Sequence, residues 1–386
     1  MGVEHHVAAE LLLGAWLRVP QQISGGYISN VAITGSSFGS GTISNTAISN
    51  GTVANAAISG GTVANATISN ATYSGNFAVV GNVSATGTVS MATSFLRNKL
   101  INGGMAVDQR NSGASQTITA GAALAYTVDR WYAYCTGANV TGQRVSASAP
   151  NQYVYQITGA TGNTAVGFGQ RIETANSYDL AGTTATLSVA LAASSITTVN
   201  WTASYANSTD TFGTLASPTV TQIATGTFTV SSTLTTYNKQ ISIPSAAITG
   251  LQIVFTTAAL TGTLSIGTAQ LEPGSVETAF ERRSAGQELA LCQRYFIDSN
   301  PSSSTASATT VACASGSGNT TSSPIILPTT MRIAPSISTR NVAVFNGSGI
   351  GVSATFPFSI QLYIVSTASG VAQLNATFNF SASAEL

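Results

Sequence analysis

The chain contains 386 residues, of which 44% are apolar and only 7% are charged, and its formal net charge is zero. This length allows two or three domains with apolar cores, but the charged fraction is far below the roughly 25% of ordinary soluble domains, so hydroxyl, amide and backbone groups must form most of the surface. With no net positive charge and no basic run, the composition argues against a nucleic-acid partner.

Residues 1–20 predict a short amphipathic helix that ends at Pro20. Apolar residues recur every four positions in this segment: Val3, Val7, Leu11 and Ala15. The run is too short to span a bilayer, and the glutamates around it are not typical of a signal peptide. Because an uncovered apolar face would be costly, we interpret the segment as a docking helix that fastens the protein to a larger particle. A frayed terminus is the alternative.

Residues 21–76 keep a period of five. The apolar positions of this pentad segment, each five residues after the last, are Ile23, Ile28, Ile33, Phe38, Ile43, Ile48, Val53, Ile58, Val63, Ile68 and Tyr73. Side chains repeat every 3.6 residues in a helix and every 2 in a strand, so neither fits. A wound β-helical coil does, with one apolar residue pointing inward per pentad and Gly, Asn or Ser at the corners. A flexible linker, the alternative, has no reason to keep this phase.

The pentad segment is short for a solenoid. At about four pentads per coil, its eleven apolar positions make fewer than three coils, and solenoids below about three repeats rarely hold a core alone. We therefore expect a β-wound shaft that packs against other copies of the chain.

After a joint at 77–94, residues 95–283 contain short runs of alternating apolar and polar residues separated by turn signals. Six of these runs are 184–191, 200–205, 225–230, 239–243, 250–255 and 262–271. Their spacing predicts an antiparallel β-sandwich. Pro273-Gly274 is expected to end the last of these strands.

Residues 284–386 are expected to form a helix followed by a smaller sandwich. Ser284 predicts the helix start, with Glu288 near the capping-box position, and Leu289, Cys292 and Tyr295 or Phe296 form an apolar face. The strand-like runs that follow are 323–328, 341–345, 358–365 and 377–382.

The stretch from Gln270 to Phe296 resembles a known family. Its QLEPGSVETAFERRS and ELALCQRYF segments resemble motifs of phage tail-fibre and receptor-binding proteins, as do the NKLING segment after Arg97 and the final Ala-Glu-Leu. The resemblance implies that 95–283 is a jelly roll similar to carbohydrate-binding modules. It also implies a homotrimer in the virion, at a tail fibre or tail tip. Residues 1–20 would then dock to other tail or baseplate proteins, and the ligand would be a bacterial surface polysaccharide.

No catalytic constellation is present, so we expect a protein without enzymatic activity. The carboxylates Glu173, Asp179 and Asp210 are the best candidates for a glycosidase pair, but they follow no motif. Glu272, Glu277 and Glu281 are interpreted as turn and ion-pair residues with the neighbouring arginines. The histidines His5 and His6 are adjacent, and the three cysteines are scattered, so neither a metal, a cofactor nor a disulfide framework is expected.

Aromatic residues suggest where a glycan would bind, because sugar rings present C–H faces that stack on Trp and Tyr. The candidates are Trp201, Tyr205, Asp210 and Tyr134. Trp201 and Tyr205 are expected on one strand face that leads into a polar loop ending at Asp210. Trp131 is expected in the core, and Asp129 and Arg130 are expected to pair. A structural fibre without its own ligand and a polysaccharide depolymerase are the alternative functions.

Overall fold

The computed structural model describes residues 96–121, 123–300, 309–313, 319–321, 324–366 and 374–386. The chain divides into two units, Met1–Ser84 and Ala85–Leu386, and every described residue belongs to the second. The predicted docking helix, pentad segment and joint lie outside the described residues.

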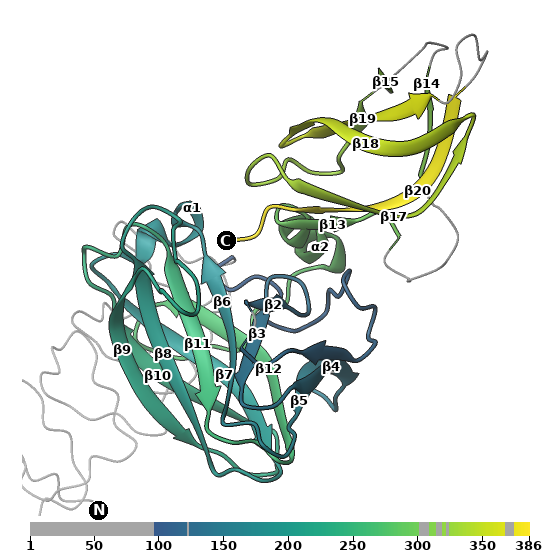
Figure 1. Ribbon diagram of the computed structural model, residues 1–386. Helices are drawn as coiled ribbons and strands as arrows, with labels where there is room; N and C mark the ends of the chain where they lie inside the picture. The colour runs from purple at the N-terminus through teal and green to yellow at the C-terminus, as the bar shows by residue number, and fades with distance from the viewer. Residues whose placement is uncertain (1–95, 122, 301–308, 314–318, 322–323, 367–373) are drawn as a thin grey trace, which may run out of the picture. The chain divides into compact units, whose positions relative to one another are not determined.

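Residues 96–283 form a sandwich of two six-stranded antiparallel sheets (Figure 1). In spatial order, sheet A contains β1 (Gln116–Ile118), β4 (Val140–Ser146), β5 (Tyr153–Thr158), β12 (Thr263–Pro273), β7 (Thr184–Ala193) and β10 (Thr235–Ser242). Sheet B contains β2 (Ala125–Tyr126), β3 (Tyr132–Thr136), β6 (Ala165–Ile172), β11 (Leu251–Thr257), β8 (Thr198–Ala206) and β9 (Val220–Thr229). Because the chain passes back and forth between the sheets, the sandwich is a jelly roll, as predicted.

The core of the jelly roll lies between the two sheets. Trp131 is fully buried and stacks on Phe168 with ring centroids 4.9 Å apart, and Phe168 stacks on Tyr155 at 5.1 Å. Such stacked pairs add about 0.5–1.5 kcal/mol each to the energy of burial. The prediction that Trp131 is a core residue is confirmed.

The predicted helix after Ser284 is present as α2 (Ala285–Gln293), and the Ser284 hydroxyl accepts from the backbone N–H of Gln287 at 3.4 Å. Its apolar face is only partly as predicted, because Cys292 is buried whereas Leu289 is 37% exposed. Glu288 does not close a capping box. Its carboxylate instead accepts from the backbone N–H of Asn102 at 2.5 Å.

Two shorter helical turns, α1 (Thr174–Ser177) and the 3-10 turn η2 (Tyr178–Leu180), follow β6. Within the described part of the chain, no helix is long and apolar enough to cross a membrane.

The smaller C-terminal sandwich is also present. One of its two sheets contains β13 (Phe296–Asp298), β20 (Leu374–Ser383), β14 (Thr309–Cys313) and β17 (Ser336–Phe345). The other contains β15 (Asn319–Thr321), β19 (Ser359–Ser366), β16 (Ile325–Ile326) and β18 (Gly347–Phe356). Phe378 and Phe380 of β20 lie in its core.

Two charged residues that are adjacent in the sequence, Asp129 and Arg130, have separate partners. Arg130 forms an ion pair with Glu385, so the expected pair with Asp129 is wrong. Asp129 instead accepts from the backbone N–H and the side-chain amide of Gln109. Neighbours in a loop point in different directions, so adjacency in sequence does not make them partners.

The three glutamates before α2 do have structural contacts, but not with the neighbouring arginines. Glu272 forms an ion pair with Arg97 at 2.8 Å. Glu281 accepts from the backbone N–H of Asn98 at 2.8 Å, and Glu277 accepts from the side chain of Asn238 at 2.5 Å.

Candidate functional site

Two of the predicted glycan-binding residues lie on the inner face of sheet B. Trp201 and Tyr205 share one face of β8, as expected, and lie opposite Phe255 and Leu251 of β11. Both of these partners are core residues, and Trp201 is only 2% exposed. The prediction that Trp201 is a ligand residue is therefore wrong. Tyr205 is half-buried against the same core.

Asp210 lies in the loop between β8 and β9, where its main chain has a positive φ of 53°. Its carboxylate accepts from the backbone N–H of Thr174 at 2.7 Å, and its own N–H donates to the carbonyl of Thr249 at 2.9 Å. These bonds give Asp210 a structural role, because they fasten the loop to the start of α1.

Tyr134 lies on the outer face of sheet B. On β3 the alternating residues Ala133 and Cys135 are in the core, so Tyr132 and Tyr134 point to the opposite face. The tyrosine rings cross the neighbouring strand β6 at glycines, and a Cβ atom at Gly167 would overlap the ring of Tyr134. Glycine is required here because any side chain would displace the ring.

A cover loop, residues 211–218, lies beside these rings. It is closed by a backbone hydrogen bond from Thr214 to Ser217 and by a bridge between Gly213 and Pro218. Two adjoining pockets lie beside it, of about 170 Å³ and about 530 Å³, and both are lined by Tyr134, Thr214 and Leu215. We call the two together the sheet B groove.

Arg171 of β6 lies in the narrower part of the sheet B groove and is 8% exposed. Its guanidinium lies over the rings of Tyr132 and Phe212, at 5.6 Å and 5.3 Å from their centroids. Gln252, which also lines this part, accepts from its Nε at 3.1 Å. Burial raises the pKa of the Tyr134 phenol, so the groove offers a neutral hydroxyl, an amide and a guanidinium beside aromatic rings.

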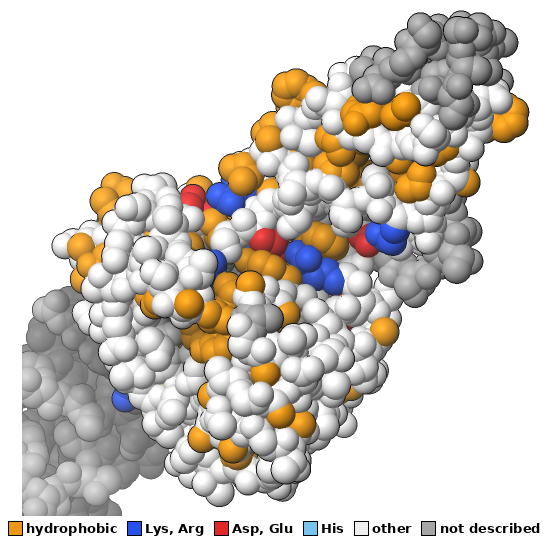
Figure 2. Space-filling view, in the orientation of Figure 1, with side chains coloured by type: hydrophobic (Ala, Val, Ile, Leu, Met, Phe, Trp, Pro, Cys, Tyr) orange, Lys and Arg blue, Asp and Glu red, His pale blue; other side chains and the backbone are white. Residues whose placement is uncertain are grey.

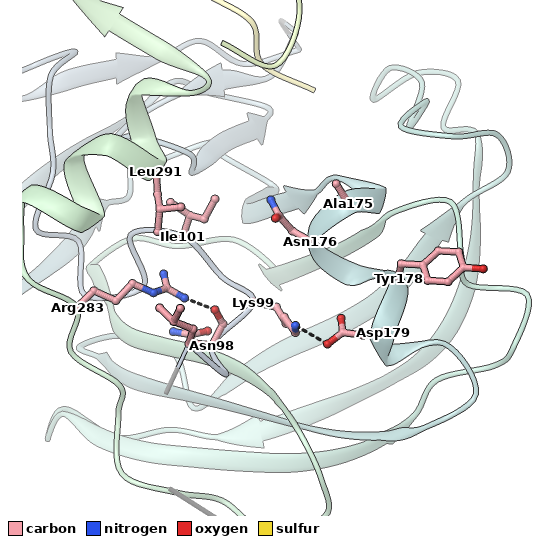
Figure 3. A pocket seen from close by; sticks show the side chains of 10 residues that line it. Asn98, Lys99, Ile101, Ala175, Asn176, Tyr178, Asp179, Arg283 and Leu291 are labelled. Carbon is pink, nitrogen blue, oxygen red and sulfur yellow. Dashed lines mark hydrogen bonds and ion pairs between the residues drawn. The ribbon is translucent and has the colours of Figure 1, made fainter. Parts of the chain in front are cut away.

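A separate pocket of about 410 Å³ lies where the described chain begins, beside η2 and α2 (Figure 3). Lys99 and Asp179 form an ion pair across it at 2.7 Å. Arg283 donates to the carbonyl of Asn98, and the ring of Tyr178 points away from the ion pair. The charged groups of this pocket therefore all have partners within the protein.

The acidic residues considered for catalysis are all held by structural contacts. Glu173 is buried and bound by Arg294 at 2.9 Å, and Asp179 and Asp210 have the partners given above. None of them is among the residues that line the sheet B groove. Within the described ranges, no cluster of three His, Cys, Asp or Glu residues could hold a metal ion.

Neither a protein-family model nor a curated protein matches the chain. It is similar in part to solved structures. One described as "CBM4 structure and function" is 19% identical, with 45% of this chain and 98% of that chain covered and a TM-score of 0.28. The C-terminal family 22 carbohydrate binding module of Clostridium thermocellum Xyn10B is 15% identical, with 39% and 89% covered and a TM-score of 0.28.

The enzymatically active domain of tailspike protein 4 of bacteriophage CBA120 is also similar in part. It is 15% identical, with 46% of this chain and 21% of that chain covered and a TM-score of 0.28. Since all three TM-scores are below 0.5, we base no functional argument on these similarities.

Proposed function

We propose that the protein is a phage tail-fibre or tail-tip component that attaches the virion to a bacterial surface glycan through the sheet B groove, without catalysis. The observation that carries the proposal is the ring of Tyr134, which lies over Gly167 on the outer face of a sheet and lines both pockets of the groove. An aromatic ring supported in this way presents a flat surface on which a sugar ring can stack.

The groove also has the polar groups that a sugar requires. Its wider pocket of about 530 Å³ is within the roughly 300–1,000 Å³ of typical ligand sites. Thr214, Gln252 and the phenol of Tyr134 supply donors and acceptors for sugar hydroxyls. A mainly apolar site with a few polar groups binds a sugar by stacking and orients it by hydrogen bonds.

The phage assignment rests on the motifs around Gln270–Phe296. Under this proposal the protein is a homotrimer, and residues 1–20 dock it to other tail or baseplate proteins. Each copy has one weak glycan site. Binding at one site raises the effective concentration of glycan at the other two, so the trimer binds more tightly than a single copy. A structural fibre without a ligand is the alternative. A depolymerase has less support, because Glu173, Asp179 and Asp210 are held by other residues.

Glycan-array binding by the full-length protein tests the proposal. We expect the Tyr134→Ala variant to bind about tenfold more weakly, which corresponds to about 1.4 kcal/mol. Tyr178→Ala is the matched control, because Tyr178 is 60% exposed and lies outside the groove. A blank array, or equal binding by Tyr134→Ala and wild type, would contradict the proposal.

Two further measurements address its other parts. Light scattering should give about three times the 39.1 kDa mass of one chain. Incubation with host polysaccharide should release no new reducing ends, whereas release of oligosaccharide would favour the depolymerase.

A further inference from the structure

Three residues follow β20, and side chains of the jelly roll hold the last two of them, Glu385 and Leu386. The carboxylate of Glu385 forms ion pairs with Arg130 and, at 2.9 Å, with Arg110. Tyr126 donates its hydroxyl to the backbone oxygen of Leu386 at 2.8 Å. Because the Arg130 and Glu385 side chains are almost completely buried, moving this C-terminal tail away would leave a buried charge without its partner.

Arg171 joins this tail to both walls of the sheet B groove. Its Nη1 donates to the backbone oxygen of Leu386 at 2.9 Å and its Nη2 donates to the carbonyl of Gly213 at 3.0 Å. Its Nε donates to Gln252 at 3.1 Å. A single guanidinium therefore contacts the cover loop, the sheet beneath it and the C-terminal tail.

The shape of arginine makes these contacts possible together. The guanidinium is a planar fork with five donors in fixed directions, whereas a lysine has one flexible ammonium group. The rings of Tyr132 and Phe212, from the sheet and the cover loop, both lie within 6 Å of it. The bond to Gly213 thus connects the Arg171 side chain to the cover loop, whose Thr214 and Leu215 line both pockets of the groove.

We propose that Arg171 is a positioning residue that holds the cover loop in the glycan-binding arrangement, and that the C-terminal tail holds Arg171. This inference rests on the proposed glycan site but can be tested without a glycan. Arg171 needs no direct contact with the sugar for this role, because it acts through Gly213 and Gln252.

Hydrogen–deuterium exchange of the full-length protein without glycan is the first measurement. In Arg171→Gln the amides of residues 211–217 should exchange about tenfold faster than in wild type, because the loop loses the bond from Arg171 to Gly213. Tyr126→Phe removes only the donor to Leu386 and should raise exchange in the same loop by a smaller factor. Arg144→Gln is the matched control, because Arg144 contacts the carbonyl of Ala106 and does not line the groove.

Glycan dissociation rates are the second measurement. If the array identifies a glycan, the glycan should dissociate faster from Arg171→Gln and from Arg171→Lys while the association rates change little. Lysine restores the charge but not the planar guanidinium with its fixed donors.

Unchanged loop exchange in both Arg171→Gln and Tyr126→Phe would overturn the inference. Faster exchange in Arg171→Gln alone would overturn the role of the tail. A blank array with faster loop exchange would remove the proposed function and leave the positioning role supported.

Should Arg171→Gln fail to fold, Gln252→Met serves instead, because it removes the acceptor for Arg171 Nε at nearly constant volume. It should also raise exchange in the cover loop, and exchange equal to wild type would count against the inference.

Discussion

The two sandwiches differ in how completely they bury their apolar residues. In the jelly roll, most residues of β7 and β12 are buried on both faces, and Trp131 and Trp201 fill the core. In the C-terminal sandwich, the ten-residue strands β17 and β18 contain no buried residue. Large apolar side chains remain exposed there: Ile326, Ile333, Val342, Phe345, Val352, Phe356 and Phe358.

This difference indicates which sandwich can be stable alone. The jelly roll has an extensive closed core, whereas the described part of the C-terminal sandwich leaves apolar side chains exposed that a neighbour could cover. Few charged side chains appear on the face shown in Figure 2, so little charge repulsion would keep copies apart. Under the proposed homotrimer that neighbour would be another copy of the chain, and the following predictions test this.

The largest expected effect comes from removing a central ring of either core. Phe168→Ala should destabilise the jelly roll by about 3–5 kcal/mol, because it removes the ring between Trp131 and Tyr155. Phe378→Ala should destabilise the C-terminal sandwich by a similar amount. Urea unfolding followed by tryptophan fluorescence reports mainly on the jelly roll, so only Phe168→Ala should shift that transition. An equal shift in Phe378→Ala would mean that the sandwiches unfold together.

A second prediction concerns the link between the sandwiches. Glu385→Gln should lower the free energy of unfolding by about 3 kcal/mol, because it leaves the buried guanidinium of Arg130 without its counter-charge. Asp179→Asn is the control. Its side chain is 61% exposed, so loss of its pair with Lys99 should change stability by less than about 1 kcal/mol. Similar losses in the two variants, measured by urea unfolding, would contradict the buried role of Glu385.

The third prediction concerns pH. Desolvation by burial raises the pKa of Asp129 from 3.8 to about 6, although Arg110 and the hydrogen bonds from Gln109 oppose it. The folded protein therefore binds this proton more tightly than the unfolded chain. The stability that this proton contributes is fully present below about pH 4 and is lost as the pH rises through 6. The free energy of unfolding falls by about 1.4 kcal/mol per pH unit in this window, a total of about 3 kcal/mol.

Asp129→Asn should remove that part of the pH dependence. The measurement is the difference in unfolding free energy between wild type and variant at pH 4, 5, 6 and 7, with Asp179→Asn as control. A difference that stays constant across the series would show that Asp129 does not titrate in this window.

The smallest change in monomer stability is expected for the exposed aromatics. Phe358 is 55% exposed and stacks on Phe356 at 5.8 Å, so Phe358→Ser should alter unfolding of the monomer by about 0.5 kcal/mol. If copies cover this surface, the same variant should form trimers only at higher concentration in light scattering. An unchanged trimer would place the interface elsewhere.

Local sequence was enough to predict part of the secondary structure. Ser284 marks the start of α2, Pro273 ends β12, and alternating runs match β7, β8 and β11. It did not predict β18, whose glycines Gly347, Gly349 and Gly351 weaken any strand pattern. Pairing with β19 makes that segment a strand, and pairing is a long-range property.

The sequence by itself therefore determined the helix and those strands that have a clear alternating pattern, because these preferences depend on near neighbours. Only the tertiary structure decided which faces are buried and which residues meet. Trp201 and Tyr134 look alike as exposed aromatic candidates, but the order of strands in sheet B places one inside and the other at the groove. Arg171 carries no local signal, because its partners lie 42, 81 and 215 residues away. Such contacts form only when the sheets pack and bring distant segments together.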